Sequence, residues 1–341
     1  MKTPNRSDKT FTTRRRFIAA GSALSASSFF GFSMTSKAEP ALDIDRVKLL
    51  YSPAVCGAVG LIAEKMLLAE GMTIEWVKDE RGRGAKSVAE GSADFGLWDA
   101  PSTVAVMDTG GELAALAGIH AGCWELMGNS RVNTLKDLKG KTVAIWGWSA
   151  GDHIILSSML TYVGLDPHKD VNWVVGPTST DPKSLFAQGR VDAFMGFAPH
   201  PQELRRMKIG HVILDTAQDR PWSQYFCCMA IAQRDFVRSH PVATKRILRA
   251  YLKAADVCAQ DPEGTARLLV DKEWERRYDI GLEVLKKLPW KHWRSANPED
   301  TLRFYALRLH EAKVIKTAPH RLVAQNTDWR FLNELKRELK A

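Results

Sequence analysis

Short apolar runs alternate with longer amphipathic stretches over most of the chain, from about residue 46 to residue 239. The stretches between the apolar runs have helical length, and their polar and apolar positions recur as they do on one face of a helix. This alternation favours α/β units built on mostly parallel sheets. The runs that predict strands are "RVKLLY", "TIEWV", "ADFGLW", "KTVAIW", "VNWVV", "VDAFMGF" and "HVILD".

Beyond residue 239 the pattern changes to helices with few strand-like runs. Pro241, Pro262 and Pro298 stand near the expected helix starts, where a missing N–H costs nothing. The helical stretches are "PVATKRILRAYLKAADVCAQ", "PEGTARLLVDKEWERR" and "NPEDTLRFYALRLHEAKVI". We expect a helical tail packed on the α/β part. Four tryptophans are expected to pack there rather than to contact a ligand: Trp274, Trp290, Trp293 and Trp329.

The chain also repeats itself at a spacing of about 97 residues. "EGSADFGLWDAP" (residues 90–101) aligns without a gap to "QGRVDAFMGFAP" (residues 188–199), and further matches lie upstream in register. "KLLYSPAVCGAVGLIAEKML" matches "KTVAIWGWSAGDHIILSSML" in outline as strand, small-residue turn and helix. The repeat predicts two similar lobes.

Charge is concentrated at the N-terminus. The formal net charge is +9, but residues 1–38 contain seven Lys or Arg against one Asp, which leaves 41 basic and 38 acidic residues in the rest of the chain. This near balance removes the main support for a nucleic-acid partner.

The pattern of the N-terminal segment predicts an export signal. "TRRRFI" (residues 13–18) resembles the twin-arginine motif, and a mildly apolar, Gly/Ser-rich stretch follows it. Ser36-Lys37-Ala38 supplies a small-x-small cleavage pattern, so we expect residues 1–38 to be removed. A membrane anchor needs about 20 apolar residues, more than this run offers. Because the first cysteine is Cys56, we expect a soluble periplasmic protein without a lipid anchor.

Five cysteines are too few and too odd in number for a disulfide framework. Cys227 and Cys228 are neighbours on a strand-like run and are expected to point to opposite faces. We interpret the cysteines as buried apolar thiols and expect no metal site, because neither Cys-x-x-Cys nor His-x-x-x-His spacing occurs.

The family resemblance is carried by three stretches: "NTLKDLKGKTVAI" (residues 133–145), "LTYVGLDPHKDVNWV" and "FAQGRVDAFMGFAP". They resemble the nitrate/sulfonate/taurine class of ABC-transporter binding proteins and their thiamine-pyrimidine-synthase-like relatives, over about residues 46–269. "YSPAVCGAVGL" departs from these relatives, which more often carry an aromatic pair there. The resemblance implies a type II periplasmic-binding fold with a C-terminal helical segment.

The expected domain boundaries follow from the repeat and the resemblance. Residues 1–38 are the signal peptide, 44–124 the first part of lobe 1, 125–225 lobe 2, and 226–341 the return to lobe 1 with the C-terminal helices. "AGCWELM" and "RPWSQYFCC" are expected to cross between the lobes, with hinge motion in residues 122–128 and 224–230.

In such a fold the ligand lies in the cleft between the lobes, where helix N-termini offer unpaired N–H groups that suit an anion. The loop 147–152 and its first-lobe counterpart at Ser52 are expected to be two such helix starts, although either serine could be an ordinary N-cap. Aromatic rings at the strand ends favour a ring-bearing ligand. Trp148 is preferred over Trp146, which could face the core. The candidate ligand-binding residues are Ser52, Pro53, Trp98, Asp99, Trp124, Trp148, Ser149, Ala150, Phe197 and Tyr225.

The function expected from these features is a non-catalytic receptor of an ABC importer, without a cofactor, that closes around a small organic, anionic, ring-bearing or sulfonate-like ligand. Its partners would be that ligand, an inner-membrane permease and, during export, the twin-arginine translocase. One alternative is a secreted serine hydrolase, because Gly147-Trp148-Ser149-Ala150-Gly151 matches Gly-x-Ser-x-Gly and Asp192, Asp215, His200 and His211 follow it in the chain. The other is a pyrimidine-synthase-like enzyme, which the export signal disfavours because that chemistry uses an intracellular cofactor.

Overall fold

A computed structural model describes residues 39–78, 83–176 and 181–340, so the signal peptide expected at residues 1–38 lies outside the described residues. The strands form two five-stranded sheets, with the orders β2-β1-β3-β10-β4 (first sheet) and β7-β6-β8-β5-β9 (second sheet). All the strands predicted above are present. Their bounds are β1 Arg46–Tyr51, β2 Thr73–Lys78, β3 Phe95–Asp99, β4 Leu113–Ala121, β5 Trp124–Gly128, β6 Thr142–Ile145, β7 Asn172–Val175, β8 Ala193–Phe197, β9 His211–Asp215 and β10 Phe226–Gln233.

The two sheets have the same plan, which confirms the internal repeat. β1, β2 and β3 correspond in order to β6, β7 and β8. β5 follows β4 of the first sheet but lies in the second sheet, and β10 follows β9 of the second sheet but lies in the first. The sheets are mixed rather than mostly parallel. β1 pairs in parallel with β2 and β3, whereas β10 is antiparallel to both β3 and β4. The physical reason is that β5 and β10 each enter their sheet directly from the other sheet.

Two connections join the sheets. The first is short, because β4 ends at Ala121 and β5 begins at Trp124. The second runs from Asp215 to Phe226 and contains the short 3-10 helix η3 (Trp222–Gln224). The strands therefore begin at residue 124 and residue 226, within the segments expected to cross between the lobes.

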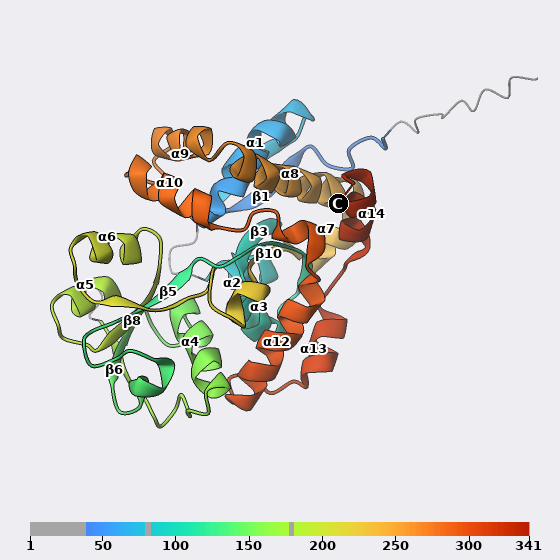
Figure 1. Ribbon diagram of the computed structural model, residues 1–341. Coiled ribbons are helices and arrows are strands. Elements are labelled where there is room, and N and C mark those ends of the chain that lie inside the picture. Colours follow the sequence, from blue (N-terminus) through green and yellow to red (C-terminus); the bar gives the residue numbers. More distant parts are fainter. Residues whose placement is uncertain (1–38, 79–82, 177–180, 341) are drawn as a thin grey trace, which may run out of the picture. The chain divides into compact units, whose positions relative to one another are not determined.

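Helices cover both sheets and continue into the predicted helical tail, in which α8 packs against α1 and α10 against α9 (Figure 1). α12 packs against both α3 and α4, so one helix of the tail contacts helices that follow strands of the two sheets. The helices are η1 Val55–Gly57, α1 Ala58–Ala69, α2 Gly84–Ala89, α3 Ala100–Asp108, η2 Leu135–Leu138, α4 Gly151–Tyr162, α5 Pro182–Ala187, α6 His200–Arg206, α7 Arg234–Ser239, α8 Pro241–Gln260, α9 Pro262–Asp271, α10 Tyr278–Lys287, α11 His292–Ser295, α12 Pro298–Glu311, α13 Pro319–Gln325 and α14 Arg330–Glu338.

The local sequence explains where the main helices begin. Pro241, Pro262 and Pro298 each occupy the first turn of a helix, as predicted. Asp99 caps α3 by accepting a hydrogen bond from the Ser102 N–H at 2.8 Å. The cap fixes α3 at the carboxyl end of β3, and this is the end that the second sheet approaches.

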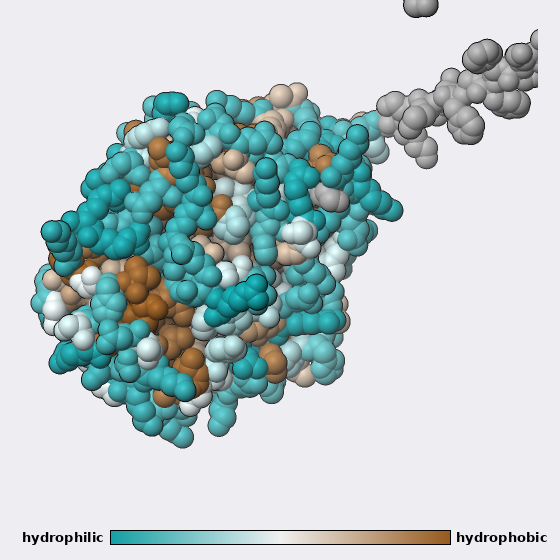
Figure 2. Space-filling view, viewed as in Figure 1, coloured by the Kyte–Doolittle hydropathy of each residue, from teal (hydrophilic) through white to brown (hydrophobic). Residues whose placement is uncertain are grey.

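The tail tryptophans pack as predicted. Trp290 and Trp293 are 1% exposed, Trp274 is buried, and Trp329 is partly buried with its indole N–H donating to Glu299. Burying such rings contributes several kcal/mol, about 1.5–3 kcal/mol for each large apolar side chain. The outer surface in the view of Figure 1 is mainly hydrophilic, with apolar atoms gathered over β5 and β8 (Figure 2). Among the described residues we find no helix with the length and apolarity required to cross a bilayer.

Candidate functional site

The helix starts of α3 and α4 meet face to face between the two sheets. A Cβ atom built on Gly151, the first residue of α4, would lie 3.3 Å from Asp99 Oδ2 and 3.4 Å from Ser102 Oγ. The same Cβ would lie 3.4 Å from Trp124 Cζ2, which belongs to the first strand after the crossing. A side chain larger than a methyl group at this position would force these groups apart. Asp99, Trp124 and the start of α4 are therefore brought together as the sequence predicted.

Two buried carboxyl groups stand at these helix starts. Asp99 is 8% exposed and Asp152, on α4, is 1% exposed. Burial raises the pKa of Asp99 to about 6, against hydrogen bonds from Ser102 that lower it. Burial likewise raises the pKa of Asp152 to about 7, opposed by the N–H groups of Trp146 and His153, which donate to its carboxylate at 2.7 and 2.9 Å. The chain itself thus supplies acidic groups where an anionic ligand was expected.

The loop before α4 presents its own polar groups to the surroundings. Ser149 is exposed, and its φ of 64° lies in the left-handed region that serine adopts rarely. Its N–H donates to His153 Nδ1 at 3.3 Å. The N-cap of α4 is Ala150, and η1 and α1 have Ala54 and Gly57 as their N-caps, so neither Ser149 nor Ser52 is a helix cap. The N-cap alternative for these two serines is therefore wrong.

The described part of the structure lacks the arrangement of side chains that the serine-hydrolase alternative requires. Within the described ranges, no hydrogen bond joins the Ser149 hydroxyl to a histidine. Asp192 precedes β8, at the other end of that strand from the site, and accepts hydrogen bonds from Asn129 and Thr142. A Ser-His-Asp relay needs the hydroxyl and the imidazole in contact.

Aromatic rings line the second-lobe side of the site. Trp124 is 6% exposed and packs edge-on against Phe197, with the ring centroids 5.1 Å apart. His200 lies beyond Phe197, 6.0 Å away between centroids. Because β6 ends at Ile145, the alternation of strand side chains does not extend to Trp146 and Trp148. Trp146 is 51% and Trp148 is 65% exposed, so neither ring lies in the core.

The remaining first-lobe candidates lie in the loop after β1 and in β3. Ser52 and Pro53 follow β1, and the Ser52 carbonyl accepts a hydrogen bond from the Ala54 N–H at 2.9 Å. Trp98 is partly buried, and its ring lies against the start of α2, where a Cβ on Gly84 would stand 2.2 Å from a ring carbon. Trp98 therefore covers the α2 backbone with one face.

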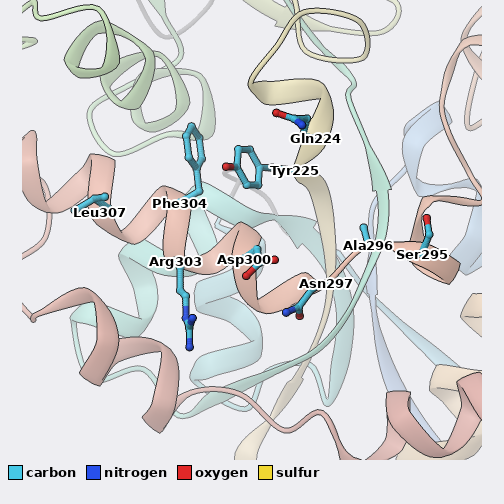
Figure 3. Close-up of a pocket in the computed structure, with 9 residues that line it drawn as sticks. All are labelled: Gln224, Tyr225, Ser295, Ala296, Asn297, Asp300, Arg303, Phe304 and Leu307. Carbon is cyan, nitrogen blue, oxygen red and sulfur yellow. The ribbon is translucent and has the colours of Figure 1, made fainter.

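Tyr225 lies on the second crossing segment and faces α12. Its ring stacks on that of Phe304 with centroids 4.0 Å apart and an angle of 14° between planes. The two rings lie side by side at an open groove of about 710 Å³ beside α12, lined also by Asp300 and Arg303 (Figure 3). Of the candidate ligand-binding residues, this groove includes only Tyr225.

Four cysteines gather where the crossing segments meet the first lobe, and we refer to Cys56, Cys123, Cys227 and Cys228 as the cysteine cluster. The Sγ atoms of Cys56, Cys123 and Cys228 all lie within 4.8 Å of one another. Cys227 Sγ is 2.7 Å from Cys123 Sγ and 3.9 Å from Cys228 Sγ. The expectation that Cys227 and Cys228 point to opposite faces is wrong. The pairing of β10 with β4 is irregular around Cys228, and this bulge turns both thiols to one side.

His120, a residue of β4, lies beside the cysteine cluster. The ring is fully buried and lies 4.7 Å from the ring of Trp290. Its Nδ1 is 3.2 Å from the Ala121 carbonyl oxygen and its Nε2 is 3.3 Å from the Cys56 carbonyl oxygen. Two carbonyl acceptors are satisfied together only by the protonated ring. Burial opposes that charge, but Cys228 and Cys56 raise the His120 pKa to about 9.

The close backbone approach at Gly151 was predicted from the sequence, whereas the cysteine cluster and the role of Asp152 were not. No local spacing marks the cluster, because its members come from three segments far apart in the chain. A signal was nevertheless present. The segments "AGCWELM" and "RPWSQYFCC" were both expected to cross between the lobes, and both carry cysteines.

Ion pairs connect the second lobe to α10, which packs on the first. On α6, Arg205 Nη2 lies 2.6 Å from Glu283 Oε1, and Arg206 Nη2 lies 3.1 Å from Glu283 Oε2. Lys287 Nζ lies 2.6 Å from Glu125 Oε1, and that carboxylate is only 3% exposed. These pairs join elements whose relative position changes if the lobes separate.

Comparison with known proteins places these features in a family. The model of the NMT1/THI5-like family matches residues 68–265, more than half of the chain. The taurine-binding periplasmic protein of Escherichia coli (strain K12) is 24% identical over 211 residues, which cover 58% of this chain and 63% of that protein. The matched region thus spans less than two thirds of the relative's length.

Solved structures share the fold. The nitrate-binding protein NrtA from Synechocystis PCC 6803 superposes with a TM-score of 0.74 at 16% identity, covering 88% of this chain and 90% of that one. The alkanesulfonate-binding protein SsuA from Xanthomonas axonopodis pv. citri, bound to MOPS, gives 0.66 at 18% identity, covering 86% and 99%. The desulfurization enzyme DSZB gives 0.59 at 14% identity, covering 86% and 99%. The fold is the periplasmic-binding fold, with two mixed five-stranded sheets, flanking helices and a helical C-terminal segment.

Proposed function

Because the chain belongs to the NMT1/THI5-like family, we propose that it is the solute receptor of an ABC importer, exported to the periplasm. In this role the chain encloses a small organic ligand between its lobes and delivers it to a membrane permease, and it catalyses no reaction. The observation that carries the proposal is the pair of facing helix starts, with Asp99 of α3 against Gly151 of α4. The nitrate-, taurine- and alkanesulfonate-binding functions in the names of its relatives also support transport.

Lobe closure is the mechanism that this architecture supports. The two connections between the sheets are the places where dihedral angles can change, and Gly122, with φ of 73°, lies in the shorter one. Ligand shifts the equilibrium to the closed form only by as much as it binds that form better. The ion pairs of Arg205 and Arg206 with Glu283 would add to the stability of the closed form.

The ligand that fits best is a ring-bearing zwitterion, with a sulfonate or carboxylate at one end and a basic nitrogen at the other. The exposed rings of Trp146 and Trp148 offer stacking surfaces. Asp99 and Asp152 favour a group that donates hydrogen bonds. In the described part of the chain, the N–H groups of Gly147 and Trp148 have no acceptor, and such amides suit anionic oxygens. Taurine and MOPS, named with two of the relatives, are both zwitterions with a sulfonate and a basic nitrogen, and MOPS also has a ring.

A thermal-shift screen tests the proposal. The panel holds taurine, MOPS, alkanesulfonates, aromatic sulfonates, aromatic carboxylates, aminopyrimidines and nitrate, and hits are followed by calorimetry. A ligand that binds only the native state raises its stability by about 2.7 kcal/mol at 100 times its Kd. We expect the largest shift from a compound with a ring, an anionic group and a basic nitrogen.

Matched variants localise the binding. Trp148→Ala should weaken the best hit by about fivefold or more, which corresponds to about 1 kcal/mol of lost stacking. Met207→Ala, a change at a side chain that follows α6 and is 61% exposed, is the control and should leave the affinity unchanged. If no compound of any class binds, or if the chain turns over its ligand, the receptor proposal is wrong.

A further inference from the structure

The cysteine cluster is the strongest feature of the molecule that ligand transport does not explain. Its thiols come from three segments: Cys56 from η1, Cys123 from the first crossing segment, and Cys227 with Cys228 from the start of β10. All four are free thiols. A buried group of soft ligands from separate segments is the arrangement that structural metal sites use.

The spacing of the sulfur atoms fits one metal ion. Zinc bound to sulfur at about 2.3 Å places tetrahedral ligands about 3.8 Å apart. Cys227 and Cys228 Sγ are already 3.9 Å apart, and Cys56, Cys123 and Cys228 Sγ lie within 4.8 Å of one another. Cys123 and Cys227 Sγ, 2.7 Å apart, would have to separate by about 1 Å, a shift within the range of side-chain rotation. The cysteines of an iron–sulfur cluster surround several atoms, so these thiols stand too close together for one.

The backbone is distorted in ways that direct these thiols inward. Cys123 has φ of 130°, a conformation that a residue with a side chain adopts at a cost of about 1–3 kcal/mol. The bulge at Cys228 brings two adjacent side chains to the same side of β10. Both distortions occur at cysteines whose Sγ atoms lie within 4.8 Å of each other.

We propose that Cys56, Cys123 and Cys228 bind a single zinc ion, with Cys227 as the fourth ligand. Each coordinating thiol releases its proton to solvent, and no oxidation takes place. A divalent ion leaves less net negative charge in this buried place than a monovalent one, and His120 Nε2 lies 3.3 Å from the carbonyl oxygen of the proposed ligand Cys56. The ion joins the β1–α1 connection to both crossing segments, and so fixes the point about which the lobes move.

Metal content and a spectroscopic titration test the assignment. The exported chain is purified anaerobically with reductant, and we expect about one zinc per chain by mass spectrometry. After chelation, added cobalt(II) should give an intense thiolate-to-cobalt absorption that saturates at one equivalent. Added zinc should bleach this absorption and raise the Tm.

Single substitutions supply the control. Cys56→Ser and Cys228→Ser should each lower zinc affinity by about 100-fold or more, while retaining a folded circular-dichroism spectrum. Cys258→Ser removes a buried thiol of α8 outside the cluster and should bind zinc like the parent. The proposal is overturned if the reduced parent binds neither zinc nor cobalt, or holds copper(I) and rejects both. It is also overturned if Cys56→Ser and Cys228→Ser bind like Cys258→Ser.

Discussion

Gly151→Leu is the substitution that most directly separates the two lobes. Gly151 begins α4, and its missing Cβ is the reason that Asp99, Ser102 and Trp124 approach so closely. A Cβ alone would meet these side chains at 3.3–3.4 Å, so alanine fits with a displacement of a few tenths of an ångström. Leucine adds three further carbons in the same direction, and they have no space unless α3 and α4 move apart.

The size of the effect follows from the cost of overpacking. Extra methylenes in a close-packed site cost about 1–3 kcal/mol. Because the crowding exists only when the lobes are closed, the whole cost falls on the closed form, and ligand affinity should fall by about 5- to 150-fold. Met207→Leu is the control, since this side chain is 61% exposed and is not a candidate ligand-binding residue. It should bind within about twofold of the parent.

Calorimetry with the best compound of the thermal-shift screen measures the affinities. Hydrogen exchange at the start of α3 and α4 reports the separation without any ligand, and Gly151→Leu should exchange faster there than Met207→Leu. Equal affinities and equal exchange in the two variants would refute the conclusion that closure brings these helix starts together.

Three further predictions concern ionised side chains. Hydrogen bonds from Thr142 hold the pKa of Asp192 at about 2 despite burial, so Asp192→Asn should cost about 2 kcal/mol in denaturant unfolding at pH 7. That cost should shrink as the pH falls from 4 to 2, because the stabilisation is lost only as the native carboxylate protonates. Asp152 has its pKa raised to about 7, so the native state holds an extra proton between about pH 4 and 7 and loses stability as the pH rises, by up to about 1.4 kcal/mol per pH unit. Asp152→Asn should flatten this slope, and an unchanged slope would contradict the burial argument. Lys287→Met removes one cation from the buried Glu125 and should lower the unfolding free energy by about 3 kcal/mol, which thermal denaturation measures.

The sequence predicted the architecture well because the strands, helices and lobes follow periodic patterns of apolar and polar residues. The strand runs mark the alternating units, and the spacing between "EGSADFGLWDAP" and "QGRVDAFMGFAP" reveals the second lobe. β4 and β5 were not predicted as strands. β4 is buried at every position, so "LAALAGIHA" has no alternation that distinguishes it from a buried helix.

The site was predicted less completely, because its chemistry depends on contacts between distant segments. Asp99 and Trp124 stand at strand ends, where the fold class places ligand contacts, and the structure brings them together. The approach of Gly151 to Asp99 requires the packing of two lobes, which no local pattern encodes. The bulge that turns Cys227 and Cys228 to one side similarly arises from the pairing of β10 with β4. Strand parity alone predicts the opposite arrangement.

Small-angle scattering with and without the best ligand of the screen tests most directly whether this chain is a receptor that closes around its solute. The account predicts that the free protein has a larger radius of gyration than the structure, in which the starts of α3 and α4 are in contact. Saturating ligand should reduce that radius to the value of the structure, and Gly151→Leu should remain expanded. Tight binding with no change in the radius of gyration would contradict lobe closure.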